Sequence, residues 1–135
     1  MDNEQEFDTE QVAAFWLTEA QEAFSVADHL VEKGDYSYAL FFGHLAIEKA
    51  LKALYVTRHQ EHAPYGHNLL RLAKAAGLEL DEEQTEALLR ITAFNIEARY
   101  PDMKRAFRQR CTFEYTTAQM ESVKRIFEWL HSLVP

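Results

Sequence analysis

The part of the sequence that most constrains the fold is residues 41–56, FFGHLAIEKALKALYV. Apolar side chains fill most of its positions, and they recur on every side of a helix drawn at 100° per residue. Such a helix is buried all round, so the rest of the chain has to cover it. Polar residues interrupt the pattern at four places, His44, Glu48, Lys49 and Lys52. Since an unpaired charge in an apolar setting costs on the order of several kcal/mol, we expect these side chains to be paired or to line a site.

The composition indicates an all-α protein. Hydrophobic residues make up 47% of the 135 residues and charged residues 27%, which is typical of a folded domain and not of a disordered chain. Only 4 Gly and 3 Pro interrupt a sequence rich in Ala, Leu, Glu, Lys and Gln, all of them good helix formers. We expect a single helical domain over residues 9–135, after an acidic N-terminal tail over residues 1–8.

Hydrophobic periodicity places the helices. Apolar residues from Val12 to Leu30 step by three or four, which predicts a first helix from Asp8 or Thr9 to about Lys33. The same signals, with Gly and Pro as breakers, predict further helices over residues 36–59, 68–76, 81–100 and 116–133. We expect an up-and-down four-helix bundle with one additional short helix, residues 68–76. Residues 101–115 are expected to form a loop with one helical turn, since Pro101 disfavours helix at the residue before it.

The charge distribution limits the choice of partner. A net charge of −8 argues against a protein that coats itself in nucleic acid, because that requires a broad basic surface. One short segment is nevertheless basic, and it is suited to holding a nucleotide or RNA locally. This segment, residues 99–110, contains one acidic residue, Asp102, and five basic residues, Arg99, Lys104, Arg105, Arg108 and Arg110.

Cysteine content and hydropathy indicate a cytoplasmic protein. Cys111 is the single cysteine, so it cannot form an internal disulfide, and this fits a reducing compartment. The acidic first ten residues contain no apolar segment of a signal peptide. No apolar run reaches the roughly 18 residues needed to cross a bilayer, so we expect no membrane association.

The polar stripe on the apolar helix allows two interpretations. His44 and Glu48 lie on one side of the helix, and Glu48 to Lys52 is the favourable spacing for an ion pair. In the first interpretation the stripe is a partly solvated edge, where Lys52 extends its ammonium group to water and Glu48 is paired. In the second it lines a groove, where Glu48 holds a basic group and His44 serves as a donor or an acid/base. Spacing alone leaves both open.

Three segments together resemble the HEPN domain family. They are YALFFGHLAIEKALKALYV (residues 38–56), GHNLLRLAKAAG (66–77) and NIEARYPD (95–102), and the resemblance covers about residues 10–132. It implies a helical bundle that is commonly a homodimer and often encoded beside a small nucleotidyltransferase. Members of this family include ribonucleases, toxins of toxin–antitoxin pairs and proteins thought only to bind nucleotides.

The resemblance also implies a binding site. It places the polar stripe, with His67 and Arg99 at its mouth, in a groove where Arg99 binds phosphate and Tyr100 stacks on a base. We therefore expect a nucleotide-binding and interaction module, a homodimer that acts with a nucleotidyltransferase in a toxin–antitoxin-like pair and needs no cofactor. The expected ligand-binding residues are His44, Glu48, Lys52, His67, Asn95, Arg99 and Tyr100.

Two alternatives use other parts of the chain. The ribonuclease branch of the family has an Arg followed by a His after four to six residues, and Arg125 and His131 have that spacing. In a metal-independent ribonuclease, His131 would be the acid/base and Arg125 would stabilise the phosphorane across a dimer interface. The pair lies about 240° apart around an unbroken helix, which does not favour this interpretation. The third hypothesis is a purely structural dimerisation protein.

Other chemistries have weaker support in the sequence. His44, Glu48 and His67 are three residues of a kind that binds zinc, but the paired Glu-x-x-His units of a di-metal bundle are absent. No feature of the sequence marks Cys111 as an activated nucleophile. We expect no metal site.

Overall fold

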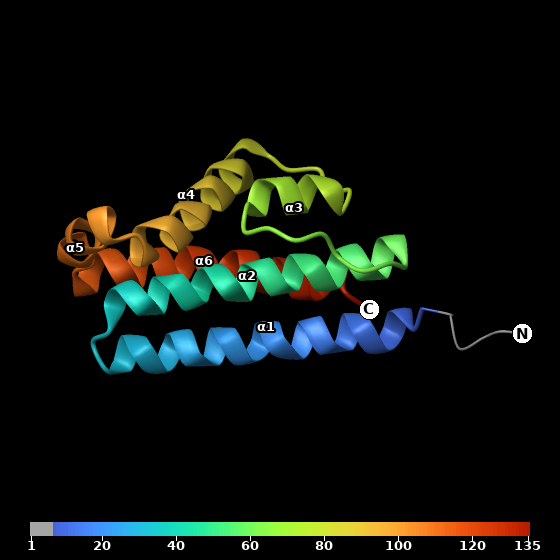
Figure 1. Ribbon diagram of the computed structural model, residues 1–135, viewed down its shortest axis with the longest axis horizontal. Helices are drawn as coiled ribbons and strands as arrows, with labels where there is room; N and C mark the ends of the chain where they lie inside the picture. The colour runs from blue at the N-terminus through green and yellow to red at the C-terminus, as the bar shows by residue number, and fades with distance from the viewer. Residues whose placement is uncertain (1–6) are drawn as a thin grey trace, which may run out of the picture.

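A computed structural model of the chain describes residues 7–135, and over that range it contains six α-helices and no strand (Figure 1). The prediction of an all-α fold is confirmed. Residues 1–6 of the predicted acidic tail lie outside the described range, and Asp8 is the residue that caps the first helix. The helices are α1 (Thr9–Glu32), α2 (Tyr36–His59), α3 (Leu69–Ala75), α4 (Glu82–Arg99), α5 (Pro101–Arg110) and α6 (Phe113–Leu133).

Most helices begin where a polar side chain bonds a free backbone N–H of the first turn. Asp8 accepts from the N–H of Gln11 at 3.1 Å, and Asn68 accepts from Arg71 at 3.1 Å. Asp81 and Gln84 form a reciprocal capping box at the start of α4. Because these caps act within one turn of the chain, the predicted helix starts at residues 9, 68 and 81 lie within about one residue of the observed ones.

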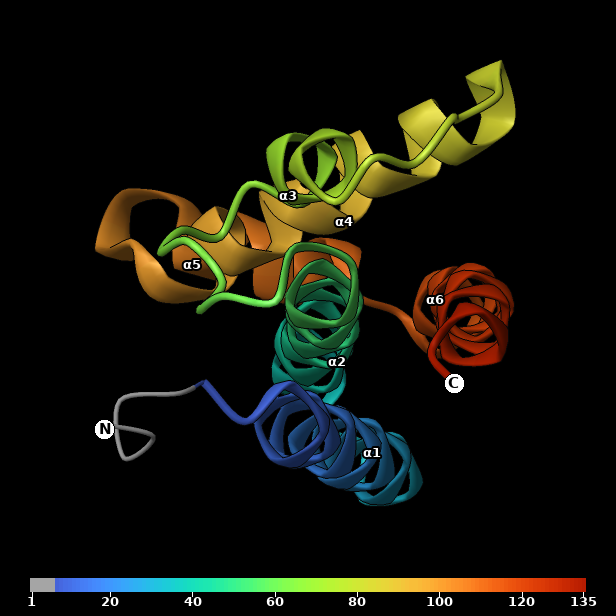
Figure 2. The same cartoon turned by 90° about the vertical axis from the view of Figure 1, so that its right-hand side faces the viewer.

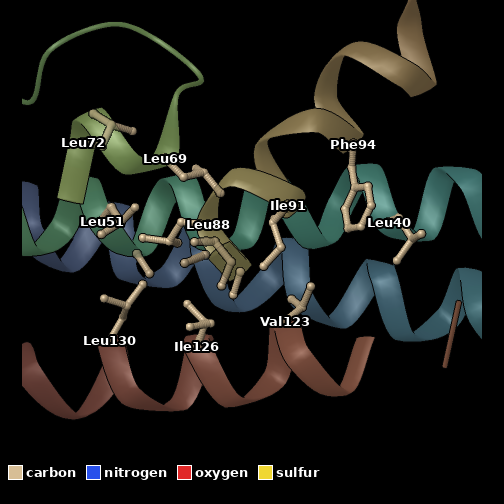
Figure 3. Packing of buried hydrophobic residues seen from close by; sticks show 14 of the residues in the cluster. Leu40, Leu51, Leu69, Leu72, Leu88, Ile91, Phe94, Val123, Ile126 and Leu130 are labelled. Carbon is tan, nitrogen blue, oxygen red and sulfur yellow. The ribbon is translucent and has the colours of Figure 1, made fainter. Parts of the chain in front are cut away.

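Helix α2 is the central element. Seen along the bundle, α2 lies between α1 on one side and α3 and α4 on the other, with α6 beside it (Figure 2). Its apolar side chains meet those of α4 and α6 in one core (Figure 3). Each buried Leu or Ile there contributes about 1.5–3 kcal/mol. Labelled in that core are Leu40, Leu51, Leu69, Leu72, Leu88, Ile91, Phe94, Val123, Ile126 and Leu130.

The region after Pro101 differs from its prediction. Residues 101–110 form the ten-residue helix α5 where a loop with one helical turn was expected. Phe107 anchors it, being 1% exposed and stacked on Phe94 at a ring distance of 5.8 Å. Pro101 ends α4 but also starts α5, since its fixed φ and missing N–H suit the first helical position. Residues 7–135 therefore form two short helices, α3 and α5, and four longer ones.

Helix α5 lies at the end of the molecule where α2 begins (Figure 1). After it, Thr112 accepts from the N–H of Tyr115 at 3.1 Å and starts α6 at Phe113, three residues before the predicted start. Helices α1, α2 and α6 run along the long axis, whereas α4 is inclined to them (Figure 1). Over residues 7–135, no helix combines the length and the apolar composition needed to span a membrane.

Candidate functional site

The buried carboxylate of Glu48 lies at the centre of the polar stripe on α2. Its Oε2 accepts from Lys52 Nζ at 3.1 Å, and its Oε1 accepts from His67 Nδ1 at 2.8 Å. Glu48 is only 4% exposed and Lys52 only 7%. The Lys52 ammonium group also lies 5.1 Å from the ring centre of Trp16 on α1. The stripe is therefore a buried, paired cluster and not a solvated edge of the bundle.

His44 lies one turn before Glu48 and is fully buried. Its Nε2 donates to the backbone carbonyl of His67 at 3.0 Å and lies 3.7 Å from Glu48 Oε1. Burial lowers the pKa of His44, and the hydrogen bond to His67 and the charge of Glu48 only partly oppose this shift. The ring is therefore neutral when the protein is folded near neutral pH. With Nε2 as its donor, its Nδ1 holds a lone pair that has no partner within the described residues.

His67 is held to α2 by both its ring and its backbone. It lies in the loop between α2 and α3. Gln60, which follows the last residue of α2, has a left-handed conformation with φ 56°, and Asn68 caps α3. Its backbone carbonyl accepts a hydrogen bond from His44 and its Nδ1 donates one to Glu48, while the His67 side chain stays 49% exposed. Since Nδ1 donates to the carboxylate, Nε2 is left as the free edge of the ring, without a partner among residues 7–135.

The end of α4 supplies the other predicted residues. Asn95 is 5% exposed and its Oδ1 lacks a hydrogen bond within residues 7–135. Arg99 is exposed and donates from Nε to the carbonyl of Asn95 at 3.3 Å. No hydrogen bond of the described residues joins Arg99 to Glu48, so the lysine is the cationic partner of that carboxylate. The Arg99 charge is nonetheless close enough to contribute to the lowered pKa of His44.

Two more residues complete the predicted set. Tyr100, which is 53% exposed, lies at the junction of α4 and α5 with its ring available to solvent. Lys49, the fourth polar residue of the stripe, points to α1, where it donates to Glu19 Oε1 at 3.4 Å. The structure thus brings together His44, Glu48, Lys52 and His67, assigns Lys49 to a link between helices, and leaves Arg99 and Tyr100 exposed.

The geometry does not favour zinc at this cluster. His44 Nε2 and His67 Nδ1 both act as hydrogen-bond donors, so neither of these nitrogens offers a lone pair to a metal. Within the described part of the chain, no group of three or more His, Cys, Asp or Glu residues is placed to hold a metal ion.

Arg125 and His131 lie in different places within the chain. Arg125 lines a hollow of about 350 Å³ between α4 and α6, together with Arg90 and Trp129. His131 faces α1, where its Nε2 lies 3.1 Å from the amide nitrogen of Gln21. The monomer does not bring the two side chains together.

Sequence reasoning missed a second polar site, at the beginning of α2. A hollow of about 270 Å³ there is lined by Ser37 and Tyr38 of α2 and by Arg108 of α5. The basic segment after Pro101 was the available signal, but its place beside α2 depends on α5 being a helix. Cys111 lies at the wall of this hollow, and burial raises the pKa of its thiol to about 11, so it is not an activated nucleophile.

Comparison with known proteins agrees with this architecture. The HEPN domain family, described as "HEPN domain", matches residues 13–133. Among solved structures, the crystal structure of TT1696 from Thermus thermophilus is similar, with a TM-score of 0.75 and 25% sequence identity. That similarity covers 90% of this chain and 97% of TT1696. A search of curated proteins found no significant match.

Proposed function

Because this chain belongs to the HEPN domain family, we propose that it is a nucleotide-binding and interaction module that forms a homodimer. We further propose that it acts with a nucleotidyltransferase in a toxin–antitoxin-like pair. The observation that carries the nucleotide proposal is the arrangement of His67. A buried carboxylate orients its ring at 2.8 Å, while the ring remains 49% exposed.

The exposed groups match the parts of a nucleotide. The free Nε2 of His67 accepts a hydrogen bond from a ribose hydroxyl or a base amino group when neutral, and donates to a phosphate when protonated. The terminal nitrogens of Arg99 offer a fork for phosphate oxygens. The ring of Tyr100 offers a stacking face for the base. These three residues would contact the ligand directly.

The buried residues have a different role in this proposal. Glu48 and Lys52 are less than a tenth exposed and His44 is fully buried, so a ligand at the surface does not reach them without a rearrangement. They act through His67, whose ring and carbonyl they hold in place. A ring held in its binding orientation loses less conformational entropy when the ligand arrives.

An exposed apolar surface on α4 supports the homodimer. Leu89 and Ile96 lie two turns apart on one face of α4 and are 52% and 42% exposed. Met103 of α5 is also exposed, at 42%. A second copy packed antiparallel on this face would place the acidic start of α4 against the basic end of the other copy. The acidic residues are Glu82, Glu83 and Glu86, and the basic residue is Arg105 of α5.

Nucleotide binding is tested by thermal unfolding of the purified protein with ATP, AMP, GTP or a short RNA. A ligand at about 100 times its Kd stabilises the folded state by about 2.7 kcal/mol, which raises Tm by several degrees. We expect one nucleotide to give this rise and Arg99→Ala to abolish it. Arg71→Ala, which removes an exposed arginine from α3, is the matched control and should keep the response.

Two outcomes of this titration would contradict the proposal. If no nucleotide raises Tm, or if Arg99→Ala and Arg71→Ala respond equally, the cluster is a structural pairing only. RNA cleavage that disappears in His131→Ala would instead support the ribonuclease hypothesis.

The homodimer and the partner have their own tests. Light scattering should give about twice the 15.7 kDa mass of the chain, and Ile96→Glu should reduce it to a single copy. Phe15→Glu changes a similarly exposed residue on α1 and should leave the dimer intact. A nucleotidyltransferase encoded beside this chain should co-elute with it after co-expression, and separate elution of the two proteins would remove the partner from the proposal.

A further inference from the structure

The hollow at the beginning of α2 contains several groups that attract an anion. It has a volume of about 270 Å³ and lies between the turn that precedes α2 and the side of α5. Residue 37 in this hollow is about 16 Å along the helix axis from Glu48, at 1.5 Å per residue. The hollow is therefore separate from the cluster that holds His67.

The first backbone N–H groups of α2 have no partner. Asp35 occupies the capping position, but its side chain makes no capping hydrogen bond. Within residues 7–135, no acceptor bonds the N–H of Tyr36, Ser37 or Tyr38. Free N–H groups and the positive end of a 24-residue helix both favour a negative charge at this position.

Ser37 adds a buried polar group that also lacks a partner. It is 8% exposed, lines the hollow, and makes no side-chain hydrogen bond to any described residue. Its oxygen is accessible to solvent, unlike the sealed, unpartnered atoms of His44, Asn95 and Thr116, so it opens into the hollow and is free to donate to an acceptor there. An acceptor in the hollow would satisfy this hydroxyl together with the free N–H groups beside it.

Two cations of α5 face the same place. Lys104 and Arg108 are one turn apart on α5, and Lys104 Nζ lies 5.5 Å from the ring centre of Tyr38. Lys104, and to a smaller extent Arg108, lowers the pKa of the Tyr38 hydroxyl. Neither cation forms an ion pair with a carboxylate in the described part of the chain. The lining itself holds one cation, Arg108, and one acid, Asp35, and Lys104 adds a second cation beside the lining residue Tyr38.

We propose that this hollow binds a phosphate group, held by the N–H groups at the start of α2, the hydroxyl of Ser37 and the side chains of Arg108 and Lys104. The chemical class is a phosphate monoester or diester, from a free nucleotide or from an RNA backbone. Arg108 supplies the fork that matches two phosphate oxygens, and Lys104 supplies a mobile point charge.

The test is an NMR titration of the amide-labelled protein with inorganic phosphate, against chloride at equal ionic strength. The amides of Ser37 and Tyr38 should shift and saturate with phosphate and not with chloride. Arg108→Gln should weaken the phosphate affinity about tenfold, since a charged hydrogen bond is lost. Arg105→Gln is the matched control, because Arg105 is exposed on the same helix and does not line the hollow, and its affinity should change less than about twofold.

Further arms identify the source of the phosphate and the part played by the buried hydroxyl. AMP that saturates the same amides more tightly than inorganic phosphate indicates a nucleotide, whereas a tighter short RNA indicates a phosphodiester backbone. Ser37→Ala, a conservative change in a helix, should weaken binding while leaving the fold intact. The proposal is wrong if phosphate and chloride act alike, or if Arg105→Gln weakens binding as much as Arg108→Gln does. The readout at residues 37 and 38 is independent of the His67 site, so either proposal can fail alone.

Discussion

Two polar regions share helix α2 and use their charges in opposite ways. In the middle of the helix, Glu48 accepts hydrogen bonds from Lys52 and His67, and the group is buried. At its beginning, Lys104 and Arg108 of α5 approach an exposed hollow without a carboxylate partner in the described residues. Charged residues that satisfy one another hold the fold together, and charged residues left without partners at a surface are available to a ligand.

The largest expected effect comes from removing the centre of the buried cluster. Glu48→Ala leaves the Lys52 ammonium and the His67 N–H without their acceptor, so we expect a loss of about 3–5 kcal/mol in the free energy of unfolding. Urea unfolding of the wild-type protein and of Glu48→Ala measures this loss. If Glu48→Ala does not fold, the single variant Lys52→Met is compared with the double variant Glu48→Gln/Lys52→Met. The single variant leaves the buried Glu48 carboxylate without its lysine, whereas the double variant contains no buried charge in the cluster. A cost below about 1 kcal/mol for Glu48→Ala would mean that water reaches the cluster.

A smaller effect concerns the pH dependence of stability through His44. Burial lowers its pKa in the folded protein, whereas in the unfolded chain the pKa is about 6.5. As the pH falls below about 6.5, the unfolded state takes up a proton that the folded state does not, so stability decreases until the pH reaches the folded pKa. The slope from this group is at most about 1.4 kcal/mol per pH unit.

Urea unfolding between about pH 7.5 and 5.5 tests this, with His44→Gln as the comparison. The amide of Gln can still donate to the His67 carbonyl but does not titrate, so the slope below about pH 6.5 should become shallower. Equal slopes for the two proteins would show that another group carries the pH dependence.

The smallest effect on stability is expected at the hollow. Arg108→Gln removes a cation with no carboxylate partner among residues 7–135, so the free energy of unfolding should change by less than about 0.5 kcal/mol. Urea unfolding beside Glu48→Ala gives the direct contrast between the two regions. A loss of more than about 1 kcal/mol would indicate that Arg108 is paired in the folded protein after all.

The electrostatic side of the comparison is measured on Tyr38. Lys104 lowers the pKa of its hydroxyl, so Lys104→Met should raise that pKa toward the ordinary value. Titration of the Tyr38 ring by NMR follows the change, and Arg105→Met serves as the control. An unchanged Tyr38 pKa in Lys104→Met would place that ammonium group away from the hollow.

The sequence predicted the features that depend on interactions between residues close together in the chain, and it missed those that depend on contacts between distant residues. The helix starts at Asp8, Asn68 and Asp81 depend on caps one turn long, so they could be read from the sequence. Helix α5 could not, because its stability depends on Phe107 stacking on Phe94 thirteen residues earlier. Pro101 at the first helical position is a sequence signal for the start of α5, but the prediction took it only as a sign that α4 ends.

The candidate site divides in the same way. That His44, Glu48 and Lys52 share one face of α2 follows from helix geometry alone. Glu48 bonds His67 and not Arg99. This choice of partner depends on the path of the loop before α3, which no local sequence pattern determines. The hollow at Ser37 and Arg108 joins residues about seventy positions apart, so only the folded chain reveals it.

The double attachment of His67 also has a consequence for binding kinetics. Its carbonyl and its ring are bonded to α2 at residues one turn apart, so the loop cannot lift away without breaking both bonds at once. A ligand that binds the free edge of the ring therefore needs no prior opening of the loop. Its observed association rate should rise in proportion to ligand concentration and reach no plateau, as expected when encounter and not a conformational step limits binding.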